Sequence, residues 1–256
     1  MKLFIYFAIA SLLLVLTSSC QKDEATKTKT YFDYPGFVKD GLVAYYPMNG
    51  NVNDYGGNGH HGILHGAIPS VDRFGSTNGA YSFDGENDFI EILNSTKFNG
   101  NRGTICFWVR IPHSDPGEHR VIFSKAGTSD GGIVISQNEN EIATITKLPS
   151  TELITRIYFT EPDYFFAAVA FTENNLTTYY EGKFQEHADY IPEQLFNNNQ
   201  QTLHIGKSII DDDVIYYYKY KNGVVKNFKG ELDDVLIYDR ALTATEIDQL
   251  SNWKKN

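Results

Sequence analysis

Three consecutive acids followed by a cluster of tyrosines form the stretch of this sequence best suited to bind a ligand. The candidate ligand-binding residues are Asp211, Asp212, Asp213, Tyr216, Tyr218 and Tyr220. Carboxylates accept hydrogen bonds from sugar hydroxyls, and aromatic rings pack against the apolar faces of sugars. Strand alternation would place the three tyrosines on one face. The alternative is an edge hairpin whose tyrosines cover the core and whose acids face water.

A second acidic motif, Glu86-Asn-Asp-Phe-Ile-Glu91, has the spacing of the catalytic carboxylates in laminarinase-type retaining glycosidases. Retention requires a nucleophile and an acid about 5 Å apart. In a regular strand Glu86 and Asp88 share one face and Glu91 points to the other, so catalysis would require a bulge. Asn87 also replaces the usual aliphatic residue. The motif therefore favours a non-catalytic turn, and we assign no catalytic residues.

The sequence between residues 40 and 240 is a series of short strand patterns with turn residues between them. Thr104–Ile111 is a strong pattern because apolar side chains lie on both of its faces. The two faces are formed by Ile105, Phe107, Val109 and Ile111, and by Cys106 and Trp108. Such a strand belongs in the middle of a covered sheet. We therefore expect an all-β fold, a two-sheet antiparallel jelly-roll sandwich with a short C-terminal helix.

The end of the chain predicts a strand, a corner and this short helix. Alternation in Leu232–Tyr238 gives two expected faces, formed by Leu232, Asp234, Leu236 and Tyr238, and by Asp233, Val235 and Ile237. A corner follows the strand. Thr243 and Glu246 have the spacing of a capping box, so the helix should begin there and run to about Ser251.

Five sequence blocks, taken in order, resemble the bacterial laminin G-like domains of the concanavalin A-like superfamily of lectins and glucanases. These blocks begin at Gly41, Ala80, Thr104, Thr202 and Gly230. The resemblance implies a jelly roll whose closing strand lies beside its first strand. It implies less about activity, because one fold can carry different sites.

The same resemblance implies a structural calcium ion where the first long loop meets the closing strand. The matching residues are Asp54 and Asn58 in the loop Asn49–Gly62, and Asp233 in the strand. Calcium takes oxygen ligands, and a loop rich in glycine and asparagine can supply backbone carbonyls. The alternative is that Asp54 and Asn58 form Asx turns and that Asp233 caps a neighbouring loop.

The amino terminus has the features of an export signal followed by a tether. The apolar run Leu3–Leu16 precedes Thr17-Ser-Ser-Cys20, which resembles a bacterial lipoprotein signal. We expect residues 1–19 to be removed, Cys20 to be lipidated, and residues 20–36 to form a flexible tether before the domain at 37–256. Gln21-Lys-Asp-Glu after the cysteine resembles the short signal that sends some Gram-negative lipoproteins to the outer face of the outer membrane, which implies lipid anchoring there and exposure at the cell surface. For these four residues the alternative is a plain solvated tether, and for the signal as a whole it is an ordinary secretory peptide.

The composition limits the kinds of partner. The 256 residues carry a formal charge of −10, and they lack the basic footprint of a nucleic-acid-binding protein. With Cys20 lipidated, Cys106 is the remaining thiol, so no internal disulfide can form. We predict a surface lipoprotein, held to the membrane by its lipid only, with a non-catalytic domain that binds a glycan or an extracellular protein. The alternatives are a glycoside hydrolase acting on polysaccharide and a structural adhesion component.

Overall fold

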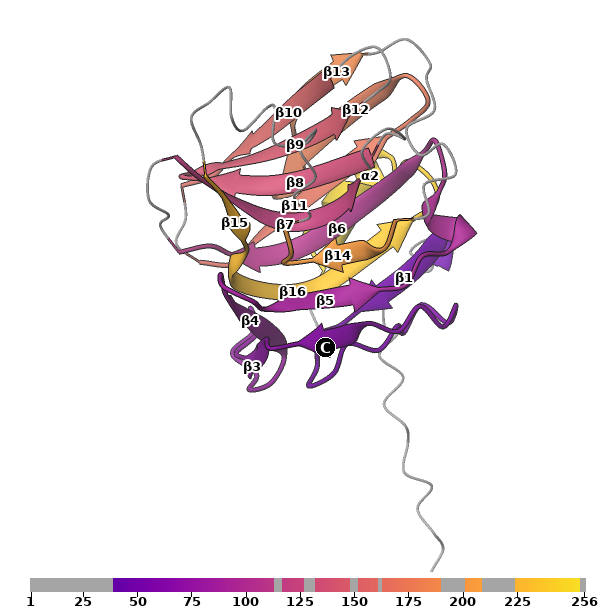
Figure 1. Cartoon of the computed structure of the whole chain (residues 1–256). Helices are drawn as coiled ribbons and strands as arrows, with labels where there is room; N and C mark the ends of the chain where they lie inside the picture. The colour runs from indigo at the N-terminus through magenta and orange to yellow at the C-terminus, as the bar shows by residue number, and fades with distance from the viewer. Residues whose placement is uncertain are drawn as a thin grey trace, which may run out of the picture. The chain divides into compact units, whose positions relative to one another are not determined.

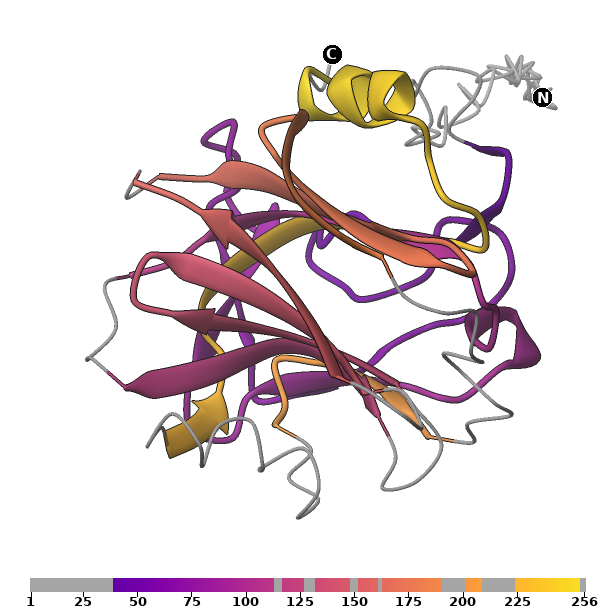
Figure 2. The same ribbon diagram turned by 90° about the horizontal axis from the view of Figure 1, so that it is seen from above.

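Two β-sheets face each other in the computed structural model, and the single α-helix of the described residues, α2 (Ala244–Ser251), lies outside them. A short 3-10 helix, η2 (Thr96–Phe98), precedes β6 (Gly103–Arg110). Figure 2 shows the sheets as the layers of a sandwich, with α2 on the outer side of one layer. The structure describes residues 39–112, 117–126, 132–147, 152–160, 163–189, 201–208 and 224–253. All of these belong to one unit, 33–256, and Met1–Phe32 lies outside them. The all-β jelly-roll prediction is confirmed.

The first sheet contains eight strands and joins the beginning of the domain to its end. Its order is β13-β12-β11-β6-β16-β4-β3, and β1 pairs with the second half of β16 (Figure 1). The strands are β1 (Leu42–Tyr46), β3 (Ile68–Ser70), β4 (Ala80–Asp84), β6 (Gly103–Arg110), β11 (Phe165–Phe171), β12 (Asn175–Tyr180), β13 (Lys183–Asp189) and β16 (Lys229–Tyr238). The first and closing strands are therefore neighbours, as the resemblance implied.

The second sheet also contains eight strands, in the order β10-β9-β8-β7-β14-β5-β2, with β15 parallel to the start of β7. The strands are β2 (Ile63–His65), β5 (Phe89–Ile92), β7 (Glu118–Ala126), β8 (Gly132–Asn138), β9 (Glu141–Lys147), β10 (Glu152–Tyr158), β14 (Leu203–Ile205) and β15 (Val224–Asn227). Strands β7 to β10 form an antiparallel meander. The start of β7 and the end of β10 therefore lie at the same border of the sheet.

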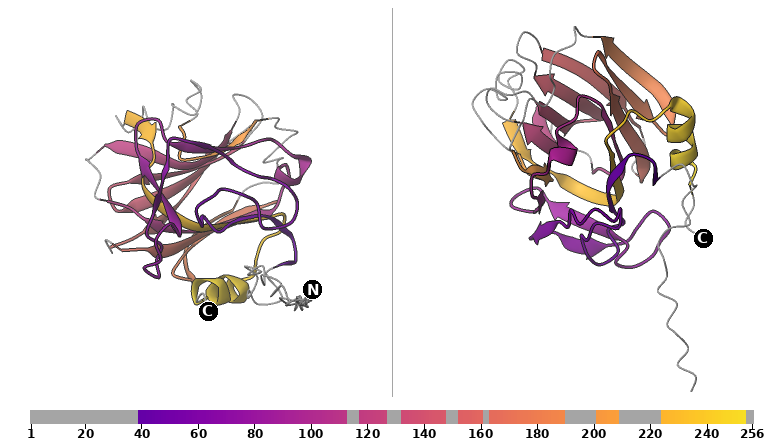
Figure 3. Two further views of the ribbon diagram at one scale, coloured as in Figure 1. Left: turned by 90° about the horizontal axis from the view of Figure 1, so that it is seen from below. Right: turned by 90° about the vertical axis from the view of Figure 1, so that its right-hand side faces the viewer.

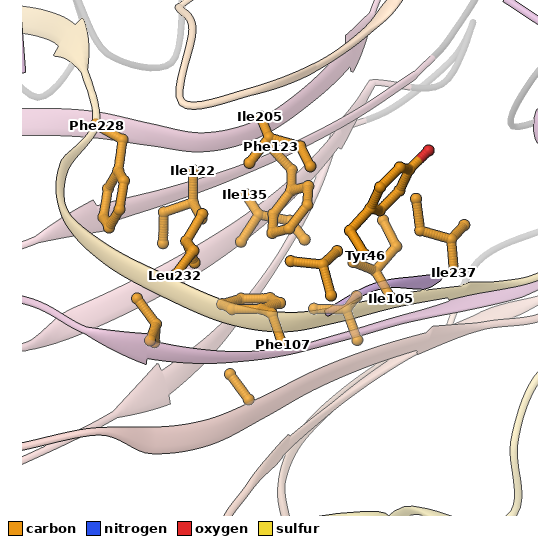
Figure 4. Close-up of a cluster of buried hydrophobic side chains, with 14 of the residues drawn as sticks. Tyr46, Ile105, Phe107, Ile122, Phe123, Ile135, Ile205, Phe228, Leu232 and Ile237 are labelled. Atoms are coloured by element: carbon orange, nitrogen blue, oxygen red, sulfur yellow. The ribbon is translucent and has the colours of Figure 1, made fainter. Parts of the chain in front are cut away.

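The core lies between the sheets, where inward side chains of both layers meet. Figure 4 shows Phe123 of the second sheet facing Phe107 and Ile105 of the first. The ring centroids of Phe107 and Phe123 are 4.9 Å apart. Trp108 points the other way, and its ring lies 4.6 Å from that of Phe166. The predicted two-sided burial of β6 is confirmed, and each large apolar side chain buried in this way contributes about 1.5–3 kcal/mol.

The closing strand departs from simple alternation. The register between β16 and β6 shifts between Asp233 and Leu236, and Asp234 has a left-handed φ of 43°. Because of this bulge, Leu232 and Ile237 both lie in the core (Figure 4). Our expectation that these two residues occupy opposite faces is therefore wrong, since an extra residue at a bulge reverses the alternation. The bulge also buries both aspartates completely.

The capping box predicted for α2 is confirmed. The Thr243 hydroxyl accepts from the Glu246 N–H, and the Glu246 carboxylate accepts from the Thr243 N–H. Arg240 donates to both oxygens of Glu246 at 2.9 and 2.8 Å, and mainly through these bonds the pKa of Glu246 falls to about 2. Figure 3 shows α2 beside β12 and β13. No helix within the described ranges is long and apolar enough to span a membrane.

Candidate functional site

A polar cleft opens where β7, β8, β9 and β10 end at one border of the second sheet. Its volume is about 470 Å³, and its lining residues are Gly117, His119, Asn138, Glu139, Asn140, Glu141, Arg156 and Tyr158. The antiparallel pairings β7–β8, β8–β9 and β9–β10 bring these strand ends together. Small-ligand pockets have volumes of roughly 300–1,000 Å³, so this cleft can hold a small ligand.

Strand alternation points the cleft side chains away from the core. Ile142 and Ile157 belong to the core, so Glu141, Arg156 and Tyr158 project from the outer face of the sheet. Tyr158 is 61% exposed, which leaves an aromatic ring open to solvent. The outer face thus offers one apolar surface among polar groups.

The turn between β8 and β9 forms one wall of the cleft. Glu139 has a left-handed φ of 50°, and its carbonyl accepts from the Gln137 side chain at 2.8 Å. The Asn140 carbonyl accepts from the Phe159 N–H at 3.0 Å, which ties the turn to the end of β10. These bonds hold the wall in place, so that the cleft is formed before a ligand binds.

The polar side chains of the cleft have partners that fix their positions. Asn138 Nδ2 lies 3.1 Å from His119 Nε2. Arg156 Nε lies 3.4 Å from Glu141 Oε1, and Arg156 Nη1 lies 3.9 Å from Glu186 Oε1. Acids and bases are thus mixed along the cleft, which suits an uncharged ligand that both donates and accepts hydrogen bonds.

Sequence analysis did not identify these cleft residues. It assigned no functional role to His119, Arg156 or Tyr158. The available signal was weak: Arg156 and Tyr158 alternate with buried Ile157, so a cation and an aromatic ring share the outer face of one strand. Nothing in that pattern indicates that the start of β7 lies nearby, because the meander alone creates this proximity.

The acid–tyrosine stretch lies outside the described residues. This holds for all six candidate residues, Asp211, Asp212, Asp213, Tyr216, Tyr218 and Tyr220. Cys20 also lies outside the described residues. Val224, which follows the stretch, donates its N–H to the Gly117 carbonyl at 2.9 Å. Because Gly117 lines the cleft, the chain is at the cleft border directly after the stretch. The binding role of the six residues and the lipidation of Cys20 stay predictions.

Asp54 organises the first long loop. Its Oδ1 accepts from the N–H groups of Tyr45 and Gly56 at 3.0 and 2.6 Å, and its Oδ2 accepts from that of His60 at 3.0 Å. Asn58 donates its side-chain amide to two carbonyls of β1. The bond between Gly56 and Asp54 is an Asx turn, the alternative that the sequence left open. These bonds tie the loop to β1.

Asp233 has a different set of partners, in the bulge of β16. Arg73 Nη1 donates to Oδ2 of Asp233 and of Asp234, both at 2.6 Å. Burial and the neighbouring Asp234 raise the pKa of Asp233 well above its usual value, although Arg73 opposes this. Within the described ranges, no group of three or more His, Cys, Asp or Glu side chains could hold a metal ion. The contacts of Asp54 and Asp233 do not fit one shared cation site, and calcium stays a prediction.

The three carboxylates of the second acidic motif have separate environments. Glu86 is exposed in the turn between β4 and β5. Asp88 is buried and accepts from the Asp84 N–H at 2.9 Å. Glu91 lies in β5, with Oε2 3.2 Å from Nε2 of His65. The motif thus forms the turn that the sequence favoured.

Comparisons with known proteins agree with this fold. Residues 84–248 match a laminin G-like family model, described as the concanavalin A-like lectin/glucanases superfamily. This range is more than half of the chain and contains the whole cleft. No curated protein matches the sequence.

Solved structures show the same fold at low sequence identity. The binding domain of Paraclostridial Mosquitocidal Protein 1 has a TM-score of 0.67 at 17% identity, over 84% of this chain and 52% of that one. Domain 4 of AbnA, a GH43 extracellular arabinanase from Geobacillus stearothermophilus, was solved in complex with arabinotriose. It has a TM-score of 0.63 at 17% identity, over 82% of this chain and 98% of that one. The binding domain of Botulinum neurotoxin DC, in complex with rat synaptotagmin II, has a TM-score of 0.62 at 14% identity, over 84% of this chain and 52% of that one.

The chain therefore spans about half the length of the two toxin chains and nearly all of the arabinanase domain. These TM-scores, at sequence identities of 14–17%, establish the shared fold alone. With the family match over residues 84–248, it follows that this chain belongs to the concanavalin A-like lectin/glucanase superfamily.

Proposed function

We propose that this chain is a cell-surface lipoprotein whose jelly-roll domain binds a glycan in the cleft of the second sheet. The observation that carries the proposal is the exposed ring of Tyr158 beside the amide of Asn138 and the side chains of His119, Glu141 and Arg156. A sugar has an apolar ring face and hydroxyl groups around its edge. The cleft offers a complement to both, without a strong excess of either charge.

The comparisons support a binding role. The arabinanase domain was solved with arabinotriose, and this chain covers 98% of it. That likeness supports a carbohydrate ligand for the present domain. The toxin binding domain solved with synaptotagmin II instead supports an extracellular protein as the second candidate ligand.

A glycan array probed with the full-length chain in detergent tests the proposal. The best glycan would then be titrated by calorimetry against Tyr158→Ala. We expect affinity to fall about tenfold, because an aromatic contact contributes roughly 0.5–1.5 kcal/mol. Phe184→Ala is the matched control, because Phe184 is 59% exposed but lies on β13 of the other sheet.

Equal loss of affinity in both variants, or in neither, would place the glycan elsewhere. If no glycan binds and an extracellular protein is captured through Tyr158, the second candidate is correct. The array therefore separates the two ligand classes before any variant is made.

A further inference from the structure

A second pocket lies on the outer face of the first sheet, and four aromatic side chains are among its lining residues. Its volume is about 270 Å³, and Phe74, Trp108, Tyr164 and Trp253 line it. Trp108 is nearly buried beneath it, whereas Phe74 is 41% exposed. The pocket is separate from the glycan cleft, which lies on the other sheet.

One guanidinium group already shows which chemistry this pocket favours. The Cζ atom of Arg73 lies 4.0 Å from the ring centroid of Trp108, 4.3 Å from that of Phe74 and 5.3 Å from that of Trp253. A cation over an aromatic face is attracted by the negative charge of the π system, and the planar guanidinium also stacks on it. Three rings therefore surround a single arginine.

Carboxylates outnumber cations at this pocket. Asp233 and Asp234, behind the pocket, share Arg73, the one cation among its described lining residues. Arg110 lies 5.2 Å from the ring centroid of Tyr164, but its charge is paired with Glu231 at 2.8 Å. Asp163 and Glu181 add two further acids at the exposed side of the pocket. The local potential is therefore negative, and it favours a cationic ligand.

The carboxylates around the pocket also affect the pKa of Tyr164. Burial is the largest cause of its raised pKa, the carboxylates of Glu231 and Asp233 raise the pKa further, and Arg110 lowers it. Glu181 is oriented by the Phe166 N–H, which donates to its Oε1 at 2.6 Å. An acid is thus held beside the aromatic walls.

We propose that this pocket binds a second guanidinium group, the arginine side chain of a partner protein. Its plane would lie against Trp253 and Tyr164, and its charge would face Asp163 and Glu181. Arginine is favoured over lysine because a planar guanidinium both stacks on rings and donates in pairs to carboxylates. This partner site shares no lining residue with the glycan cleft, so it can be tested whether or not a glycan binds there.

Tryptophan fluorescence reports directly on this pocket, because the chain has two tryptophans and both line it. The full-length chain in detergent would be titrated with N-acetylarginine amide at constant ionic strength. We expect a saturable change in emission with a dissociation constant in the millimolar range, because single exposed contacts are weak. The citrulline analogue, equal in shape but uncharged, should give no saturable change, and the lysine analogue should bind more weakly.

The double variant Asp163→Asn/Glu181→Gln should weaken arginine binding about tenfold. Glutamine can still accept from the Phe166 N–H, so the turn should keep its geometry. Glu173→Gln is the matched control, because Glu173 pairs with Arg102 and is exposed, away from the pocket. It should leave the titration unchanged, as should Tyr158→Ala in the glycan cleft.

Equal binding of the citrulline analogue would overturn the proposal, since charge would then have no role. So would an arginine titration that the double variant leaves unchanged, or the lack of any saturable signal. Loss of glycan binding in Tyr158→Ala with an intact arginine titration would uphold both sites separately.

Discussion

At the scale of single residues, Arg73 compensates two acids that the fold has removed from water. Asp233 and Asp234 are fully buried, and each places one oxygen 2.6 Å from Arg73 Nη1. The Tyr45 hydroxyl also donates to Asp234 at 2.5 Å. Burying charged carboxylates is costly, and removing their cation leaves that cost without compensation.

Arg73→Met should therefore lower the free energy of unfolding by about 3–5 kcal/mol at neutral pH. The loss should be smaller near pH 5. An acid whose pKa is raised in the folded state holds its proton more tightly when folded, so its contribution to stability falls as pH rises. Asp233 is such an acid, and removing Arg73 raises its pKa further.

Urea denaturation at several pH values measures this effect. Arg102→Met is the control, because Arg102 pairs with Glu173 at the surface, where ion pairs contribute little. A loss that is equal at all pH values would show that Arg73 acts through packing on the rings rather than through charge.

Asp54 is the second residue whose role can be isolated. Asp54→Ala removes the acceptor of three backbone N–H groups, so it should cost about 2–3 kcal/mol. Asp54→Asn keeps one acceptor oxygen and should cost less. Thermal melting in chelator and in calcium checks both. The hydrogen bonds alone would give the same loss in either buffer, whereas a loss confined to the calcium buffer would support the predicted metal site.

At the scale of elements, the turn between β12 and β13 sets the position of α2. Glu181 and Gly182 have φ values of 48° and 73°, the left-handed pair that a two-residue hairpin turn requires. A Cβ atom on Gly182 would overlap the Ser251 hydroxyl and would lie 2.9 Å from Asp248 Cα. Glycine is therefore required at position 182 for two reasons: the backbone is left-handed there, and α2 packs too closely to leave room for a side chain.

Gly182→Ala should lower the free energy of unfolding more than Gly50→Ala does. Gly50 has a similar φ of 69°, but a Cβ atom there meets nothing within 4 Å. Gly50→Ala measures backbone strain alone, about 1–2 kcal/mol. The additional loss in Gly182→Ala, measured by urea denaturation, reports the displacement of α2; equal losses would show that the helix moves freely.

Elements with strong local patterns could be predicted from the sequence. Strand β6 has apolar side chains on both of its faces, and α2 has both members of its capping box, Thr243 and Glu246. The bulge at Asp234 could not be predicted from the sequence. Its position depends on the register between β16 and its partner strand β6. The short strands β2, β3 and β15 were also missed. Three or four residues carry little pattern, and their neighbours in the sheet make them strands.

The candidate site was harder to predict than the fold because its residues come from four strand ends. His119 and Tyr158 are far apart in the sequence, and only the meander brings them to one cleft. Asp233 illustrates the converse. Sequence analysis proposed Asp233 as a calcium ligand, whereas its partner in the structure, Arg73, comes from the distant loop between β3 and β4.

At the scale of the whole molecule, the two proposed sites lie on different sheets, each on an outer face. The glycan cleft uses the border of the second sheet, and the arginine pocket uses the first sheet and the end of α2. Neither site overlaps the other in its lining residues. A domain built in this way could hold a glycan and a protein together, which would strengthen attachment beyond either contact alone.

Such attachment requires that the domain is itself held at the cell, and Cys20 is the proposed anchor. The apolar run before it and the small residues beside it predict lipidation, and a tether over residues 20–36 would give an average reach of about 20–25 Å. Cys20→Ser should therefore release the protein from the membrane fraction. Cys106→Ser is the matched control, because Cys106 is fully buried and burial raises the pKa of its thiol, so it is not available for modification. Membrane fractionation with mass measurement of the amino-terminal peptide checks both, and retention of Cys20→Ser in the membrane at an unchanged peptide mass would refute the anchor.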